Sequence, residues 1–182
     1  MKSPHTIRSL VLITFLIAAP AIVAQDATAE ATREKTRTRL SALLQRVGPE
    51  IKVNFQPSPK SQFVFTGAMR EGLTHSEFLE IVITVTAKDT IGFRIFPHYK
   101  GGYINLDKVR NQTQLLRKLL QLNESTFLFW GADDTGDVFT GYTFTLESGF
   151  PDEAIKIVLS SIKNSDQFVG EMRSSIDGTN AP

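Results

Sequence analysis

The alternation of apolar and polar residues along this chain is most regular over residues 77–86. Every second side chain there is apolar, and the intervening positions include Glu80, Thr84 and Thr86. A period of two puts the two groups on opposite faces of a strand. The pattern predicts a strand with one wet face and one buried face, and the buried face consists of Leu79, Ile81, Ile83 and Val85.

Two further strands are expected beside it, at residues 62–67 and 91–96. Residues 87–90 form a gap short enough for a tight turn, so strands 77–86 and 91–96 are predicted to pair as an antiparallel hairpin. Pro97 lacks a backbone N–H, and we expect it to end the last strand or to place it at a sheet edge.

Apolar residues at helical spacing predict three helices. The first covers 27–47, where Leu40, Leu43, Leu44 and Val47 share a face and Gly48-Pro49 ends the helix. The second starts near Leu106 and is leucine-rich to residue 122. Pro151 begins the third, whose apolar face includes Ile155, Val158, Leu159, Ile162, Val169 and Met172.

A second hairpin is expected between the last two helices. Residues 126–130 and 138–146 read as strands, and the turn between them contains Asp133, Asp134, Gly136 and Asp137. These acids lack the alternating oxygen ligands and the distant glutamate of an EF-hand calcium loop. The sequence therefore predicts a tight turn that binds no metal.

The N-terminus has the layout of a secretory signal, with Lys2 and Arg8 before an apolar run and small residues before Gln25. We expect cleavage after Ala24 and a periplasmic or secreted bacterial protein. An uncleaved anchor is the alternative, but Thr14 and Pro20 leave the run short of the about 20 apolar residues that cross a bilayer. The predicted organisation is a signal peptide at 1–24, one domain at 25–173 and a disordered tail at 174–182.

Charge and composition reduce the number of function classes that fit this chain. The full chain has 20 basic and 19 acidic residues, and loss of Lys2 and Arg8 leaves the mature chain at net −1. A nucleic-acid binder would normally carry a basic excess on one face. The sequence has no cysteine, so the domain must depend on its core for stability. No nucleic-acid partner and no stable membrane span after cleavage are predicted.

Two segments are candidates for binding. The loop at 97–104 combines glycines with His98, Tyr99 and Tyr103, a composition that can bind ligands, although these tyrosines can equally pack over the core edge. The second segment is apolar on both faces of a strand, so one face needs a partner subunit or a client as cover. It consists of Phe127, Leu128, Phe129 and Trp130.

An enzyme is the less favoured class. His75 and His98 are not in a metal-ligand spacing, and the chain has no nucleophile elbow, phosphate-binding glycine loop or dinucleotide fingerprint. We predict no catalytic residue, cofactor or metal. A small-molecule or lipid carrier is the second alternative, in which aromatic residues of the strands line a cavity instead of filling a core. These residues are Phe63, Phe65, Phe93, Phe96, Phe127, Phe129, Trp130, Phe139 and Phe144.

The C-terminal third combines a leucine-rich run at 115–122 followed by Asn123, an aromatic run at 127–130, an acidic turn at 133–137, and Phe150-Pro151-Asp152-Glu153 with the helix that follows. In these motifs it resembles the YbjN family of proposed bacterial sensory transduction regulators. The resemblance implies a type III secretion chaperone-like fold: a helix, three strands, a helix, two strands and a last helix, with helices on one face of a twisted antiparallel sheet. It brings no catalytic residues, and members are usually cytosolic, unlike a chain with an export signal.

These observations together predict an α+β protein, and a non-enzymatic, exported module that binds a protein. Its role is expected to be chaperone-like or regulatory, with a client or a second copy of the chain as partner; a homodimer is expected. A periplasmic small-molecule or lipid carrier remains the alternative function.

Overall fold

The computed structural model describes residues 20–178, with side chains from Thr28 onward. Its strands are β1 (Gln56–Ser58), β2 (Ser61–Met69), β3 (Phe78–Val85), β4 (Thr90–Tyr99), β5 (Gly102–Tyr103), β6 (Phe129–Ala132) and β7 (Val138–Thr145). Its α-helices are α1 (Pro20–Val47), α2 (Gln112–Ser125), α3 (Asp152–Ser161) and α4 (Ser165–Asp177). The order of elements is the predicted one, with β1 and β5 as additional short strands.

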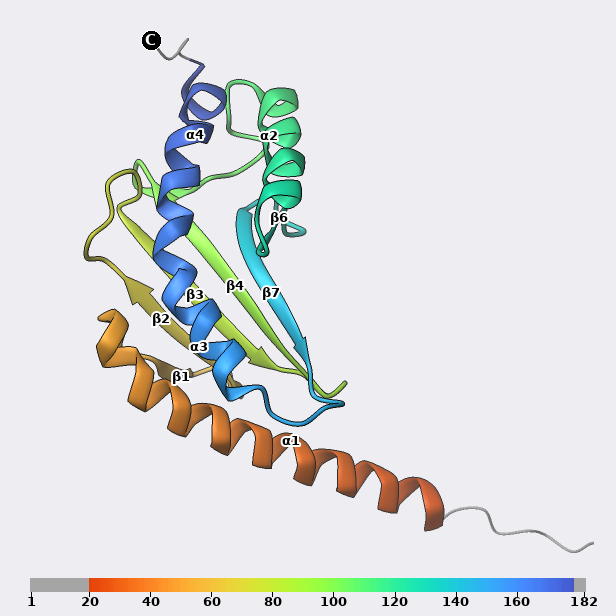
Figure 1. The fold of residues 1–182 in the computed structure, drawn as a ribbon. Coiled ribbons are helices and arrows are strands. Elements are labelled where there is room, and N and C mark those ends of the chain that lie inside the picture. The colour runs from red at the N-terminus through yellow and green to blue at the C-terminus, as the bar shows by residue number, and fades with distance from the viewer. Residues whose placement is uncertain (1–19, 179–182) are drawn as a thin grey trace, which may run out of the picture.

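The strands form one antiparallel sheet in the order β1-β2-β3-β4-β7-β6, and β5 pairs with the end of β4. The sheet is twisted, and α3 and α4 run across one of its faces with α1 and α2 on either side of them (Figure 1). The predicted α+β class, with an antiparallel sheet and helices on one face, is confirmed.

The main core lies between the sheet and helices α1 and α3. The register pairs Ile81 with Ile95 and Ile83 with Phe93, which aligns apolar side chains of β3 and β4 on one face. Leu40, Leu43 and Leu44 of α1 pack into the same cluster, as their helical spacing predicts. The predicted faces of strand 77–86 and helix 27–47 are both confirmed.

A second core joins α2 and α4 to β6 and β7. Asn111 caps α2 by accepting a hydrogen bond from the backbone N–H of Gln114 at 3.0 Å, so the helix begins at Gln112 and the expected start near Leu106 is wrong. Its buried face is Leu115, Leu119 and Leu122, which contact Trp130, Val138, Val169 and Met172. Because leucines are consecutive in this helix, the sequence pattern alone was compatible with more than one buried face.

The predicted single last helix is divided into α3 and α4 by a short 3-10 segment, Ile162–Asn164. Asp166 in the first turn of α4 accepts backbone hydrogen bonds from Thr74 at 2.5 Å and Ser76 at 2.6 Å, as well as from His75. The carboxylate thus ties the β2–β3 connection to α4. Helix α4 continues to Asp177, so residues 174–177, which were predicted to belong to a disordered tail, are helical. Residues 179–182 lie outside the described part.

Pro97 lies inside β4, so the first of its two predicted roles, ending the strand, is wrong. The pairing of β4 with β7 ends at Ile95, where Ile95 faces Thr140, so Pro97 lies beyond the part of β4 that β7 flanks. It keeps its place opposite Leu79 of β3. A missing N–H is tolerated at such a position.

Both edges of the sheet are blunted. Edge strand β1 is short and contains Pro57. At the other edge, the side chain of Asn123 accepts a hydrogen bond from the Trp130 N–H and donates one to the Trp130 carbonyl, at 2.5 and 3.1 Å. The amide occupies the place of a further strand. These features disfavour the addition of a partner's strand at either edge.

Residues 1–19 lie outside the described part, and the predicted cleavage position after Ala24 falls within α1. In residues 20–178, no helix combines the length and apolar character needed to cross a bilayer. Export and cleavage stay predictions.

Candidate functional site

The sheet face opposite the helices carries a continuous chain of aromatic side chains, which we call the ring chain. Successive ring centroids are 3.8 Å apart for Phe78 and His98, 4.3 Å for His98 and Tyr103, and 5.7 Å for Tyr103 and Phe96. The chain continues from Phe96 to Phe139 at 5.5 Å and ends on Phe129 at 5.7 Å. These rings come from five strands, so the register of the sheet creates the ring chain.

The ring chain lies on the open face because of the strand period. Each of its members on β3, β4, β6 and β7 neighbours a core residue along the strand, as Phe96 neighbours Ile95 and Phe129 neighbours Trp130. Since successive side chains alternate, the rings point away from the helices. Tyr103 and Phe129 are the most accessible members, 42% and 41% exposed.

Gly141 allows Phe129 to lie flat on the sheet. It pairs with Phe129 in the β6–β7 register and with Arg94 in the β4–β7 register. A Cβ atom at Gly141 would lie 2.3 Å from the Phe93 carbonyl oxygen and 3.1 Å from the Phe129 ring. A side chain at this position would clash with the backbone of β4 and crowd the ring, so glycine is required here.

Glu80 is the polar centre of the ring chain. Its carboxylate accepts a hydrogen bond from the Tyr103 hydroxyl at 2.7 Å and is 3.1 Å from His98 Nε2. The Glu80 hydrogen bond, burial and the charges of Glu80, Asp137 and Asp133 raise the pKa of Tyr103 to about 12. The phenol is therefore a neutral hydrogen-bond donor at physiological pH, and negatively charged side chains surround it.

An open hollow of about 730 Å³ lies over this part of the sheet. Its floor includes Gly92, where a Cβ atom would meet no neighbour within 4 Å. The other residues that line it are mainly aromatic, acidic or hydroxyl-bearing, and they include Glu80, Arg94, Phe96, Tyr103, Phe129, Asp133, Asp137 and Thr143. Such a mixture suits contact with a ligand or partner that is partly apolar and partly charged.

The predicted candidates divide between this face and the interior. Leu128 and Trp130 are buried in the two cores, whereas Phe129 belongs to the ring chain. Phe127 is exposed but contacts Tyr142, at 6.2 Å between centroids, and not the rings of the open face. Phe129 is thus the residue of this run that lies on the candidate surface.

The candidate residues of the predicted ligand loop also lie in two different places. It forms the hairpin of β4 and β5, in which His98 pairs with Tyr103. Both side chains belong to the ring chain, but Tyr99 points to α4, where its hydroxyl donates to Asp177 at 2.7 Å and accepts from Arg173 at 3.2 Å. His98 and Tyr103 are therefore joined to Phe129 in one site, and Tyr99 is structural.

Phe78 and Arg94 were not predicted to be parts of a site, and Phe96 and Phe139 were predicted only as candidate lining of a carrier cavity. The available signal was their position on the polar side of strands whose other side is core. The cross-strand neighbours, however, depend on the order β3-β4-β7-β6, which brings residues 78 and 139 onto one surface.

The acidic turn has the predicted local role. Asp133 accepts hydrogen bonds from the backbone N–H groups of Thr135 and Asp137, at 3.0 and 2.9 Å, and Gly136 has a φ of 82°. Burial opposes the ionisation of Asp133, but these hydrogen bonds and the Thr135 hydroxyl outweigh it and lower the pKa of Asp133. Within the described residues, no group of three acidic or histidine side chains is arranged to hold a metal ion.

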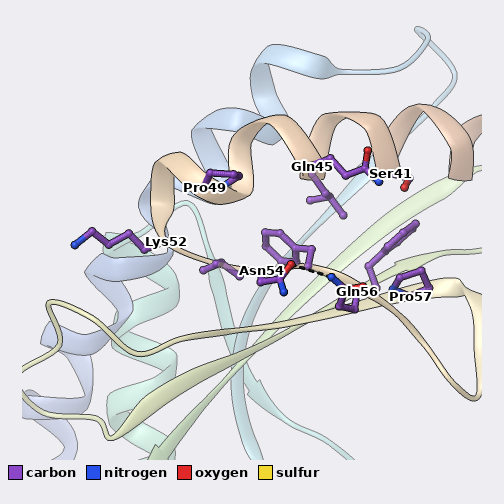
Figure 2. A pocket seen from close by; sticks show the side chains of 11 residues that line it. Ser41, Gln45, Pro49, Lys52, Asn54, Gln56 and Pro57 are labelled. Atoms are coloured by element: carbon purple, nitrogen blue, oxygen red, sulfur yellow. Dashed lines mark hydrogen bonds between the residues drawn. The ribbon is translucent and has the colours of Figure 1, made fainter.

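A second hollow, of about 470 Å³, lies between α1 and the segment that leads into β1. Figure 2 shows Ser41 and Gln45 of α1 above Asn54 and Gln56, whose amides are hydrogen-bonded at 2.8 Å. The lining is mainly uncharged, and Lys52 at its end pairs with Glu71. It lacks the exposed aromatic rings and the acidic groups of the ring chain, so we take the open sheet face as the candidate site.

Comparisons with known proteins add one likeness. No protein-family model and no curated protein matched the chain. Among solved structures, the fold is similar to that of YbjN from E. coli, a proposed transcription regulator, at 13% identity and a TM-score of 0.45, covering 72% of this chain and 89% of that one. Function is therefore inferred from the residues of the site.

Proposed function

We propose that this chain is an exported, non-enzymatic binding module that holds a protein partner on its open sheet face. The observation that carries the proposal is the ring chain, an aromatic surface on the sheet face that the helices leave uncovered. Aromatic residues in the centre of an interface supply large contact area at low cost in side-chain entropy.

The arrangement of the edges supports a face contact. Asn123 occupies the backbone groups of Trp130, and Pro57 interrupts β1, so strand addition is disfavoured at both ends of the sheet. A partner that lies across the open face would instead cover Tyr103 and Phe129. Burial of these rings by a partner contributes roughly 25 cal/mol to the free energy of binding for each Å² of apolar area removed from water.

The carrier alternative receives less support from the same residues. Of the nine aromatic residues that were candidates to line a cavity, four pack in the main core: Phe63, Phe65, Phe93 and Phe144. Trp130 packs in the second core, and Phe127 contacts Tyr142. Phe96, Phe129 and Phe139 belong to the ring chain, which is the surface that we assign to a protein. A module that binds a protein partner in this way would have a chaperone-like or a regulatory role.

The test is recovery of a partner from the native envelope with tagged, full-length chains. We expect Phe129→Ser to reduce the recovered partner strongly, while circular dichroism stays unchanged because Phe129 is half-exposed. Leu120→Ser, at a 69% exposed residue on α2, is the matched control and should recover the partner normally. Equal recovery by both variants would contradict the proposal.

A further inference from the structure

Two rings of the ring chain already have a guanidinium over them: Phe78, at one end, and Phe139, next to the other end. The Arg70 guanidinium carbon is 4.2 Å from the Phe78 centroid, and that of Arg94 is 4.8 Å from the Phe139 centroid. Among the described residues, no cation lies over Phe96, Tyr103 or Phe129. The most exposed rings of the face are therefore available to a cation from outside.

The charges around these rings favour a cation. Glu80, Asp133 and Asp137 line the hollow, and Arg94 is the basic residue that accompanies them, so acidic groups are in excess. The raised pKa of Tyr103 has the same cause, since all three acids disfavour its phenolate. A positive group that enters the hollow meets both aromatic faces and carboxylates.

The hydrogen-bond donors to two of these acids carry no charge, although the Arg94 guanidinium acts on Asp133 through its charge. Asp137 accepts hydrogen bonds from the Asn105 amide and the Thr135 hydroxyl, and Asp133 accepts from backbone N–H groups and the same hydroxyl. These donors are neutral. They orient the carboxylates without cancelling the field that a cation would experience.

We propose that the partner is a protein segment that inserts an arginine side chain into this hollow, on Tyr103 and Phe129 and facing Glu80. This inference rests on the proposed function and adds the chemistry of the partner. Arginine fits better than lysine because its planar guanidinium stacks on aromatic rings and pairs with carboxylates. A second copy of the chain is a poorer source, since Arg70 and Arg94 of the same face already lie on their own rings.

The experiment uses a short fluorescent peptide that alternates arginine and leucine, and the same peptide with citrulline, a neutral isostere, in place of arginine. Binding to the purified chain is followed by anisotropy. We expect the arginine peptide to bind more tightly and to weaken with added salt. Glu80→Gln should weaken it about threefold to tenfold, while Glu124→Gln, an exposed site at the end of α2, should leave it unchanged.

Asp133→Asn is a second variant in case Glu80→Gln disturbs the fold, because all its hydrogen bonds go to one oxygen that asparagine retains. It should weaken the arginine peptide to a similar extent. Circular dichroism checks both variants. Unchanged binding in a folded Glu80→Gln chain, together with unchanged binding in Asp133→Asn, would overturn the inference.

The outcomes separate this inference from the proposed function. If arginine and citrulline peptides bind equally and both are lost in Phe129→Ser, the face binds proteins but does not select a cation. If neither peptide binds, the inference is overturned, and recovery of the native partner by the Phe129→Ser chain decides the proposed function independently. Dimerisation that Phe129→Ser abolishes would identify a second copy as the occupant and would also overturn the inference.

Discussion

The side-chain amide of Asn123 is paired with the backbone of Trp130 on both its donor and its acceptor atoms. This contact links the last turns of α2 to the edge strand β6, and it fixes the strand that carries Phe129. One side chain thus closes the sheet edge and supports the ring chain.

Asn123→Ala should therefore reduce stability and open the edge. The Trp130 N–H and carbonyl would lose their partners, at an expected cost of about 1–3 kcal/mol in the free energy of unfolding. Denaturant titration measures this cost, and Gln121→Ala on the same helix is the control. An exposed edge should also increase self-association by light scattering. Wild-type behaviour in both measurements would show that the pairing is unimportant.

Asp166 gives the fold a specific dependence on pH. Burial opposes its ionisation, but backbone hydrogen bonds from Thr74, Ser76 and His75 outweigh burial and lower the pKa of Asp166. A lowered folded-state pKa means that the stabilisation is complete above the ordinary aspartate value and is lost as the pH falls through the lowered one.

Asp166→Asn is expected to lower the free energy of unfolding by about 1–3 kcal/mol at neutral pH, because one amide oxygen replaces a carboxylate that accepts from three backbone groups. The difference from wild type should shrink in acid. Unfolding curves recorded across the acidic range measure it, with Glu124→Gln as the control. Parallel curves for wild type and Asp166→Asn would contradict this assignment.

The buried faces of β3 and α1 were predictable because each has a regular period and a single apolar side. Helix α2 was harder, since Leu116 and Leu120 fit the same helical spacing as Leu115 and Leu119, and only packing against α4 decides between them. Helix α4 begins beside Asp166, whose carboxylate accepts a hydrogen bond from the backbone of Ser76, about ninety positions earlier in the chain. Local pattern does not contain such a contact.

The candidate site was predictable in parts. Phe129, His98 and Tyr103 stood out by composition, and Glu80 was placed on the wet face of its strand. Their meeting point depends on the pairing of β4 with both β5 and β7, which a single sequence does not specify. Tyr99 illustrates the limit, since its neighbour His98 faces Glu80 while its own hydroxyl reaches α4.

The turn at residues 133–137 should tolerate loss of charge but not of glycine. Gly136 has a φ of 82°, so Gly136→Val should destabilise the hairpin by about 1–2 kcal/mol. Asp134→Asn, on an exposed side chain, should be neutral. Calorimetric titration with calcium should give no saturable heat. Micromolar calcium binding that disappears in Asp134→Asn would refute the turn assignment.

Export predicts a defined N-terminus. The charge, apolar run and small residues of positions 1–24 should direct cleavage after Ala24. Sequencing of the chain isolated from its native envelope should begin at or near Gln25. A cytosolic chain that keeps Met1 or Lys2 would refute the prediction.

Site-specific photocrosslinking in the native cell is the most direct test of the binding surface. A photoreactive phenylalanine analogue is placed either at position 129 on the open sheet face or at position 120 on the outer face of α2, so that two exposed apolar sites on opposite sides of the sheet are compared. We expect a discrete protein adduct at position 129 and little at position 120. Adducts that form at position 120 and not at position 129 would show that α2, and not the ring chain, contacts the partner.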